Sequence, residues 1–266
     1  MSKIKNKFLQ LKKKKEKALI AYIMAGFPNE KTTMSAVKGL VKGGADIIEI
    51  GYPFSDPIAD GPVIQNASTV SLNYGTNLDK FFQIIKKIRK ETDIPLVLMT
   101  YTNILYKKGF DKFMQKAKSV GIDGFILPDM AIEESKAYLA AARKNHLDTI
   151  FLISPNTTTE RIKKILKDTS GFLYLVSIFG TTGMQTKIQK YTVNAIKKTK
   201  KIVNKRIPIG IGFGVNTPND ARKFLSLGID AIIVGSAFLR LIERTPSSKI
   251  ESKIAAFTKS LKNTTR

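Results

Sequence analysis

The sequence contains no cysteine and only one histidine. The lack of cysteine excludes disulfides, thiolate metal sites and cysteine nucleophiles. No apolar run reaches the roughly 18 residues that a membrane span requires. The basic start of the chain leads into ordinary apolar sequence rather than a signal-peptide pattern. We therefore expect a soluble cytoplasmic protein that uses no cofactor and no metal ion.

Acidic residues are also scarce: the chain has 21 of them and 45 basic residues, which gives a net charge of +24. Such a balance could indicate a nucleic-acid-binding surface, because phosphate backbones attract basic proteins. The lysines are scattered over predicted helix faces, without interleaved aromatic residues or a known nucleic-acid motif. We expect neither a nucleic-acid nor a membrane partner, although a basic surface would steer a phosphorylated substrate or an acidic protein toward the chain.

The length of 266 residues matches one (β/α)8 barrel. Short apolar runs alternate with stretches of helical period, as in parallel βαβ units. We predict an α/β fold, an eight-stranded parallel TIM barrel that forms one domain over residues 1–266. A basic helix is expected within 1–17, and a tail at 258–266 that is free to fray. The predicted strands are 18–25, 47–51, 95–100, 124–128, 149–154, 172–177, 207–214 and 231–236.

A short motif recurs immediately before three predicted strands: Gly44-Ala45-Asp46, Gly121-Ile122-Asp123 and Gly228-Ile229-Asp230. A glycine in this place ends the preceding helix, and the aspartate leads into the strand. The motif therefore marks the lower face of the barrel, where residues serve stability rather than catalysis. His146 also precedes a predicted strand, so a structural role is expected for it.

Glu49 is the only carboxylate inside a predicted strand, and none of these strands contains lysine, histidine or cysteine. Schiff-base chemistry and a strand-borne metal site therefore lack their usual residues. Burying a carboxylate is costly and raises its pKa toward the range useful for proton transfer at neutral pH. We predict a catalytic role for Glu49, with a bond to a neighbouring backbone or hydroxyl group as the alternative.

Two further aspartates lie in the loop at 51–62, which leaves the upper end of the second predicted strand. Loops on a rigid scaffold often carry functional residues. Asp60 is a candidate for a second acid–base group beside Glu49, whereas Asp56 could equally serve as a turn or capping residue.

Glycine clusters lie at or just beyond the ends of the last three predicted strands, at Gly180-Thr181-Thr182-Gly183, Gly212-Phe213-Gly214 and Gly235-Ser236. Glycines let backbone N–H groups approach an anion, and a helix amino terminus adds a favourable dipole. Because barrels frequently bind phosphate after strands 7 and 8, this order predicts a phosphate site. Strand-end side chains that would line an aromatic substrate pocket, or else pack in the core or form turns, are Tyr22, Tyr101, Asn103, Asp129 and Tyr174.

Two adjacent motifs, Phe54-Ser55-Asp56-Pro57 and Ala59-Asp60-Gly61-Pro62, closely resemble the signature of tryptophan synthase α subunits. The resemblance covers nearly the whole chain. It continues through Ile64-Gln65-Asn66-Ala67, Tyr101-Thr102-Asn103, Leu127-Pro128-Asp129, the three glycine clusters and Val234-Gly235-Ser236.

The resemblance implies that the chain is a lyase, which cleaves indole-3-glycerol phosphate into indole and D-glyceraldehyde 3-phosphate. It also assigns roles to residues. Glu49 and Asp60 would be the acid–base pair, and Gly183, Gly214, Gly235 and Ser236 would hold the phosphate. The substrate would further contact Tyr22, Tyr101, Asn103, Leu127, Asp129 and Tyr174, and Thr182 in a closing loop.

The resemblance also implies a partner, the tryptophan synthase β subunit, in an α2β2 assembly in which indole passes to the β subunit for L-tryptophan synthesis. Pro53 and Asp56 would contact it. Three alternatives stay open from the residues alone. The first is another phosphate-binding barrel enzyme, such as an isomerase or decarboxylase, and the second is a catalytically weak chain that mainly activates a partner enzyme. The third is a nucleic-acid-binding surface, which would show a steep salt dependence of DNA binding.

Overall fold

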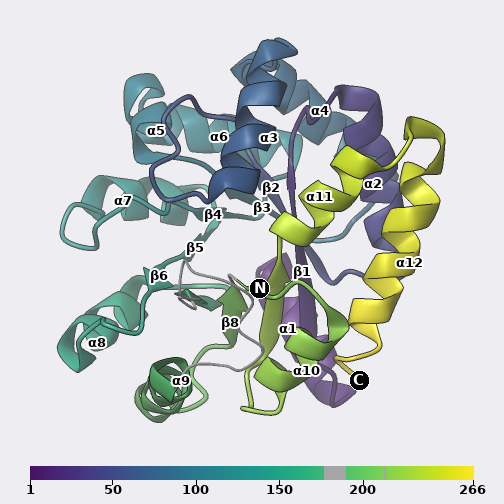
Figure 1. Cartoon of the computed structure of the whole chain (residues 1–266). Helices are drawn as coiled ribbons and strands as arrows, with labels where there is room; N and C mark the ends of the chain where they lie inside the picture. The colour runs from purple at the N-terminus through teal and green to yellow at the C-terminus, as the bar shows by residue number, and fades with distance from the viewer. Residues whose placement is uncertain (177–189, 213) are drawn as a thin grey trace.

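The computed structural model describes residues 1–176, 190–212 and 214–266 of the chain. Nine parallel strands form one sheet in the order β5-β4-β3-β2-β1-β9-β8-β7-β6, with helices arranged around it (Figure 1). This confirms the predicted α/β barrel. The strands are β1 (Ala18–Met24), β2 (Ile47–Gly51), β3 (Leu96–Met99), β4 (Gly124–Ile126), β5 (Asp148–Ile150), β6 (Leu152–Ile153), β7 (Leu173–Val176), β8 (Ile209–Gly212) and β9 (Ala231–Val234).

The predicted fifth strand differs from the structure, because it is divided at Phe151 into β5 and β6. β5 pairs with β4, and β6 pairs with β7. The backbone N–H of Tyr174 still donates to the Phe151 carbonyl at 3.0 Å, so the chain passes between the two sheet edges at this residue. Eight predicted strands thus become nine observed ones, and the barrel closes through one irregular residue.

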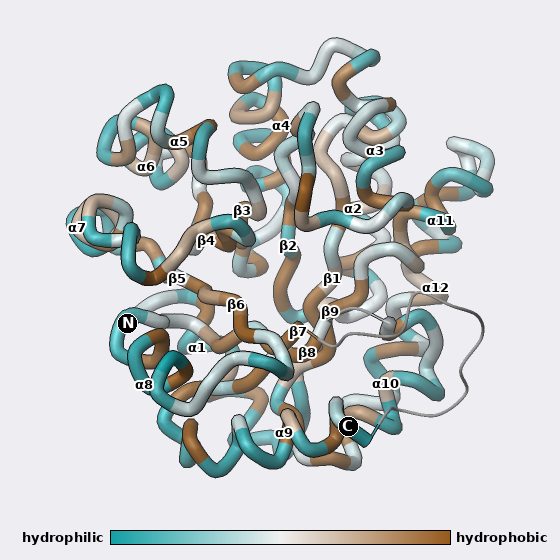
Figure 2. The backbone as a smooth tube through the Cα atoms, turned by 60° about the vertical axis from the view of Figure 1, so that its left-hand side comes forward, coloured by the Kyte–Doolittle hydropathy of each residue, from teal (hydrophilic) through white to brown (hydrophobic). Residues whose placement is uncertain are grey.

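Several helices begin at a residue whose side chain caps them, and the helices bury one face. Side chains of Asn29, Asn77, Thr158 and Thr217 accept backbone N–H groups of the first turns. Figure 2 shows apolar strands inside and polar outer helix surfaces. The helices are α1 (Lys3–Lys13), α2 (Glu30–Gly43), α3 (Pro62–Asn73), α4 (Leu78–Glu91), α5 (Thr102–Lys108), α6 (Phe110–Val120), α7 (Lys136–Lys144), α8 (Thr159–Asp168), α9 (Lys190–Val203), α10 (Pro218–Leu225), α11 (Ser236–Arg244), the 3-10 helix η1 (Ser247–Lys249) and α12 (Ile250–Lys262). Among the helices described, none combines the length and apolar character needed to cross a bilayer.

The predicted amino-terminal helix is α1, and it packs against the barrel interior. Its buried residues Ile4, Phe8 and Leu11 belong to the same apolar cluster as the inward-facing strand residues. The rings of Phe8 and Phe172 lie 6.0 Å apart. Burial of this face holds α1 at the lower end of the barrel, where the strands begin.

The three repeated aspartates perform the structural role that the sequence predicts. Each carboxylate of Asp46, Asp123 and Asp230 accepts a backbone N–H from the start of the preceding strand in the chain. The donors are Leu19 at 2.8 Å, Leu96 at 2.9 Å and Ile209 at 3.0 Å. The preceding glycines adopt positive φ, which ends their helices or turns. These aspartates therefore bind neighbouring strands together at the lower face.

The carboxy-terminal tail is packed rather than frayed. Lys262 is buried, and its Nζ lies 2.8 Å from Asp46 Oδ2 and 3.1 Å from Glu16 Oε2. The backbone N–H of Lys17 donates to the Thr265 carbonyl at 2.7 Å, and Thr265 is buried. The expectation of a loose tail failed because a basic composition does not reveal the buried carboxylate that its lysine neutralises.

Candidate active site

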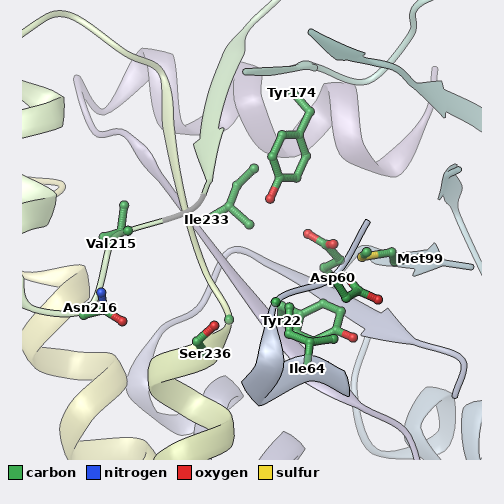
Figure 3. Close-up of a pocket in the computed structure, with 13 residues that line it drawn as sticks. Tyr22, Asp60, Ile64, Met99, Tyr174, Val215, Asn216, Ile233 and Ser236 are labelled. Atoms are coloured by element: carbon green, nitrogen blue, oxygen red, sulfur yellow. The ribbon is translucent and has the colours of Figure 1, made fainter. Parts of the chain in front are cut away.

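A pocket of about 90 Å³ lies at the carboxyl ends of the strands (Figure 3). Acidic and aromatic side chains occupy one side of it, and small residues with Asn216 the other. This is the end of a barrel at which active sites occur. The lining residues are Tyr22, Glu49, Asp60, Gly61, Ile64, Met99, Tyr174, Gly214, Val215, Asn216, Ile233, Gly235 and Ser236.

Glu49 reaches the pocket from β2, between Tyr22 of β1 and Val97 of β3 in the strand register. It is only 1% exposed, and its Oε2 has no hydrogen-bond partner among the described residues. Burial, and secondarily the charge of Asp60, raises the pKa of Glu49 to about 8. A carboxyl group of this kind is protonated at neutral pH and available as an acid.

Asp60 approaches Glu49 from the loop after β2. Its Oδ2 accepts a hydrogen bond from the Tyr101 hydroxyl at 3.0 Å, while its buried Oδ1 has no partner in the described structure. Burial raises the pKa of Asp60 to about 6, and the Tyr101 hydrogen bond opposes that rise. Asp60 is therefore mostly ionised at neutral pH and available as a base.

The loop that carries Asp60 is fixed by hydrogen bonds from outside it. Ser68 of α3 accepts from the Phe54 backbone N–H and donates to its carbonyl, both at 2.7 Å. The Tyr101 hydroxyl also accepts the Ala59 N–H at 3.1 Å, and its ring lies 5.1 Å from that of Phe54. Tyr101 itself does not line the pocket; it positions Asp60.

Two buried tyrosines form the aromatic wall beside the carboxylates. A side chain at Gly51 would place Cβ 2.3 Å from the Tyr22 hydroxyl, and one at Gly212 would place it 2.1 Å from the Tyr174 hydroxyl. Glycine at these strand ends therefore makes room for the tyrosines. Burial raises the pKa of both hydroxyls, so they remain protonated donors.

The other side of the pocket is suited to an anion. Gly214 has a φ of +82°, and Gly235 is the amino-terminal cap of α11, which starts at Ser236. The exposed N–H groups and dipole of a helix amino terminus favour a phosphate. Gly183, the fourth predicted phosphate residue, and Thr182 lie outside the described residues.

Besides Tyr101, three further predicted substrate contacts are not among the residues that line the pocket. Leu127 is buried in the core outside it, and Asn103 is exposed on α5. Exposed Asp129 caps α5 by accepting the backbone N–H of Thr102 at 3.0 Å and its hydroxyl at 2.8 Å. Their positions at strand ends suggested the pocket, which the described structure lines with other residues.

The two predicted partner contacts differ in accessibility. Pro53 is buried within the chain, whereas Asp56 is exposed on the loop after β2. Ile58, on the same loop, is 83% exposed. The loop after β2 therefore presents both a charged and an apolar side chain to solvent.

Sequence reasoning missed the apolar lining, which consists of Ile64, Met99 and Ile233, and the loop residues Val215 and Asn216. Ile64 lies in a quoted motif, but an isoleucine there looks like any core residue. Within the described ranges, no group of three or more histidine and acidic side chains could hold a metal ion.

Comparison with known proteins identifies the family to which this chain is similar. Residues 8–266 match the family model described as tryptophan synthase alpha chain. The tryptophan synthase alpha chain of Methanosarcina acetivorans is 44% identical over 261 residues, which cover 98% of this chain and 93% of the relative.

Solved structures are similar over the same length. A chain of tryptophan synthase from Mycobacterium tuberculosis superimposes with a TM-score of 0.89 at 30% identity, covering 100% of this chain and 98% of that one. A chain of the α2β2 tryptophan synthase complex from Pyrococcus furiosus, described as mutually activating, gives 0.86 at 35% identity, covering 92% and 98%.

Proposed function

Because the chain belongs to the tryptophan synthase alpha chain family, we propose that Glu49 and Asp60 are the acid–base pair of a lyase. This lyase cleaves indole-3-glycerol phosphate into indole and D-glyceraldehyde 3-phosphate. One observation carries the assignment of residues: two carboxyl groups line one pocket, and each has a buried oxygen without a partner among the described residues. Buried polar atoms are nearly always hydrogen-bonded, so unpaired ones in a pocket indicate a ligand.

The two pKa values assign the acid and base roles to the two carboxyl groups. With values of about 8 and about 6, Glu49 holds a proton at pH 7 and Asp60 does not. Glu49 therefore protonates C3 of the indole ring, while Asp60 accepts the hydrogen bond of the ring N–H and stabilises the positive charge that develops there.

Carbon–carbon cleavage completes the reaction. The ionised Glu49 takes the proton of the hydroxyl on the carbon attached to C3, and that carbon becomes the aldehyde. The electron pair of the broken bond returns to the ring and neutralises its nitrogen. Indole leaves with the new C3 hydrogen, so atoms and charge balance without water or a redox partner.

The remaining lining residues bind and orient the substrate. We assign the indole to the wall of Tyr22, Tyr174 and Met99, and the phosphate to Gly214 and Gly235 with Ser236. Separating the aromatic and anionic ends holds the scissile bond between them. Thr182 and Gly183 keep their predicted roles in loop closure and phosphate binding.

We also propose a β subunit as partner, in an α2β2 assembly that receives the indole. The exposed loop after β2 supports this, since it carries Asp56 and the 83% exposed Ile58 directly before Asp60. Buried Pro53 would then shape the loop rather than touch the partner. We further propose a single domain over residues 1–266, located in the cytoplasm.

The test is indole release from indole-3-glycerol phosphate by the purified chain, alone and with a β subunit. Asp60→Asn is expected to lower kcat by about 10²–10⁴-fold in both conditions, the range of general acid–base catalysis. The control, Asp111→Asn, removes an exposed carboxyl group on α6 and should leave turnover unchanged. Normal turnover by Asp60→Asn would exclude the proposed pair, whereas stimulation of the partner without cleavage would indicate an activator.

A further inference from the structure

A second cavity lies at the opposite end of the barrel from the carboxylate pair. Its volume is about 270 Å³, and it opens between α1, the segment from α8 to β7, and the residues before β8. A single water occupies roughly 10–15 Å³ on a comparable measure. The cavity is therefore large enough for a small metabolite.

Asp148 lines this cavity and breaks the pattern of the lower-face aspartates. Asp46, Asp123 and Asp230 each accept a strand N–H, but Asp148 Oδ2 has no hydrogen-bond partner among the described residues, although Asp148 is only 7% exposed. A buried carboxylate oxygen without a hydrogen bond is costly, and the hydrogen bonds of Ser2 and Ser170 to the same carboxyl group leave Oδ2 unexplained.

Two glycines make room for the Asp148 side chain. A Cβ at Gly124 would lie 3.1 Å from Asp148 Cβ, and one at Gly171 would lie 3.4 Å from it. Burial raises the pKa of Asp148, as does the charge of Asp123, while the hydroxyls of Ser2 and Ser170 and the charge of Lys118 lower it. A cation in the cavity would offset the cost of this burial.

Two basic side chains line the same cavity. The Arg206 guanidinium is oriented by bonds from Nε to Val203 O at 3.2 Å and from Nη2 to Ile202 O at 2.9 Å, which leaves Nη1 without a partner in the described ranges. Lys5 extends from α1, and its Nζ makes no hydrogen bond to the described residues. These groups are placed to receive an anion.

The rest of the lining divides into apolar and polar parts. Leu166, Ile207 and Pro208 provide an apolar surface, and Thr169 and Ser170 provide hydroxyl groups. A bare phosphate would meet the Asp148 carboxylate, and a simple amine would leave Lys5 and Arg206 unused. A ligand with both charges and an apolar part uses all three features.

We propose that this lower cavity binds a free α-amino acid with an apolar side chain. Its ammonium group pairs with the carboxyl group of Asp148, its carboxylate accepts from Lys5 and Arg206, and its side chain packs on Leu166, Ile207 and Pro208. The site is separate from the carboxylate pocket, and its occupancy does not depend on the reaction catalysed there.

The experiment is calorimetric titration of the purified full chain with L-leucine and L-phenylalanine at millimolar concentrations. Two analogues of leucine each lack one charge: 4-methylpentanoate has no ammonium group, and 3-methylbutylamine has no carboxylate. Because an ionic hydrogen bond is lost in each case, both analogues are expected to bind about tenfold more weakly or worse.

Variants locate the binding. Asp148→Asn and Lys5→Ala are each expected to weaken binding about tenfold, whereas Lys12→Ala, an exposed lysine elsewhere on α1, should bind as the wild type does. If Asp148→Asn does not fold, the affinities of Lys5→Ala and of the two analogues still test the proposal. The proposal is overturned if neither amino acid binds, if 4-methylpentanoate binds as tightly as leucine, or if Lys5→Ala leaves affinity unchanged.

Discussion

Replacing Glu49 by glutamine should stabilise the fold, and the gain should grow with pH. The pKa of Glu49 rises from its ordinary 4.5 to about 8 in the folded chain, chiefly because the group is buried. The folded state therefore binds more protons than the unfolded state between these values. The contribution of Glu49 to the free energy of unfolding is fully present below pH 4.5, and it is lost as the pH rises toward 8. At 1.36 kcal/mol per pKa unit, ionising Glu49 in the folded chain lowers the free energy of unfolding by about 5 kcal/mol.

The assay is urea unfolding of wild type and Glu49→Gln from pH 5 to pH 9. The variant should gain stability over the wild type by about 1.4 kcal/mol per pH unit, reach about 3 kcal/mol at pH 7, and level off above pH 8. A pH-independent difference in stability between the amide and the carboxylic acid would shift the plot of this gain against pH without changing its slope.

The control is Asp111→Asn. Its carboxyl pKa is lowered by Lys144 and Asn145 from an ordinary 3.8, so its contribution is present above that value and lost only in more acidic solution. The difference between Asp111→Asn and wild type should be flat from pH 5 to 9. A flat curve for Glu49→Gln as well would refute the reasoning, because it would mean that Glu49 is as readily ionised in the fold as in water.

Further outcomes follow from the site and the packing. The pH profile of kcat/KM should be bell-shaped, falling below pH 6 as Asp60 is protonated and above pH 8 as Glu49 loses its proton. Tyr101→Phe should move the acidic limb up by about one pH unit, since its hydroxyl stabilises ionised Asp60. Ser236→Asp should raise KM about tenfold with little change in kcat, because it puts a negative charge at the anion side of the pocket. Gly43→Ala should cost about 1–3 kcal/mol in thermal unfolding, since its Cβ would lie 2.6 Å from the Ala255 carbonyl of α12.

Local sequence was sufficient for the barrel because each strand is a compact apolar run between helical segments. It could not reveal the division at Phe151, since the run from Thr149 to Ser154 is continuous and only the geometry of closure interrupts its pairing. The packed tail escaped prediction for a related reason. Lys262 is far from Asp46 in the sequence, and their contact exists only after α12 docks on α2.

The candidate site was predictable where a charged side chain stands among residues of a different kind. A glutamate in an apolar strand and an aspartate in a proline-rich loop stand out, and the structure brings Glu49 and Asp60 into one pocket. Asp129 was harder to interpret, because a residue at a strand end can face the pocket or cap the next helix. Apolar lining residues such as Met99 carry no signal that separates them from the core.

The pairing of β1 also constrains the order in which the chain can assemble during its synthesis. β1 lies between β2 and β9, and the residue just before it, Lys17, bonds to Thr265. One edge of β1 therefore stays open until β9 has left the ribosome. An exposed strand edge is prone to wrong pairing. Closure of the barrel thus waits for β9, although β1 is made before the other described strands.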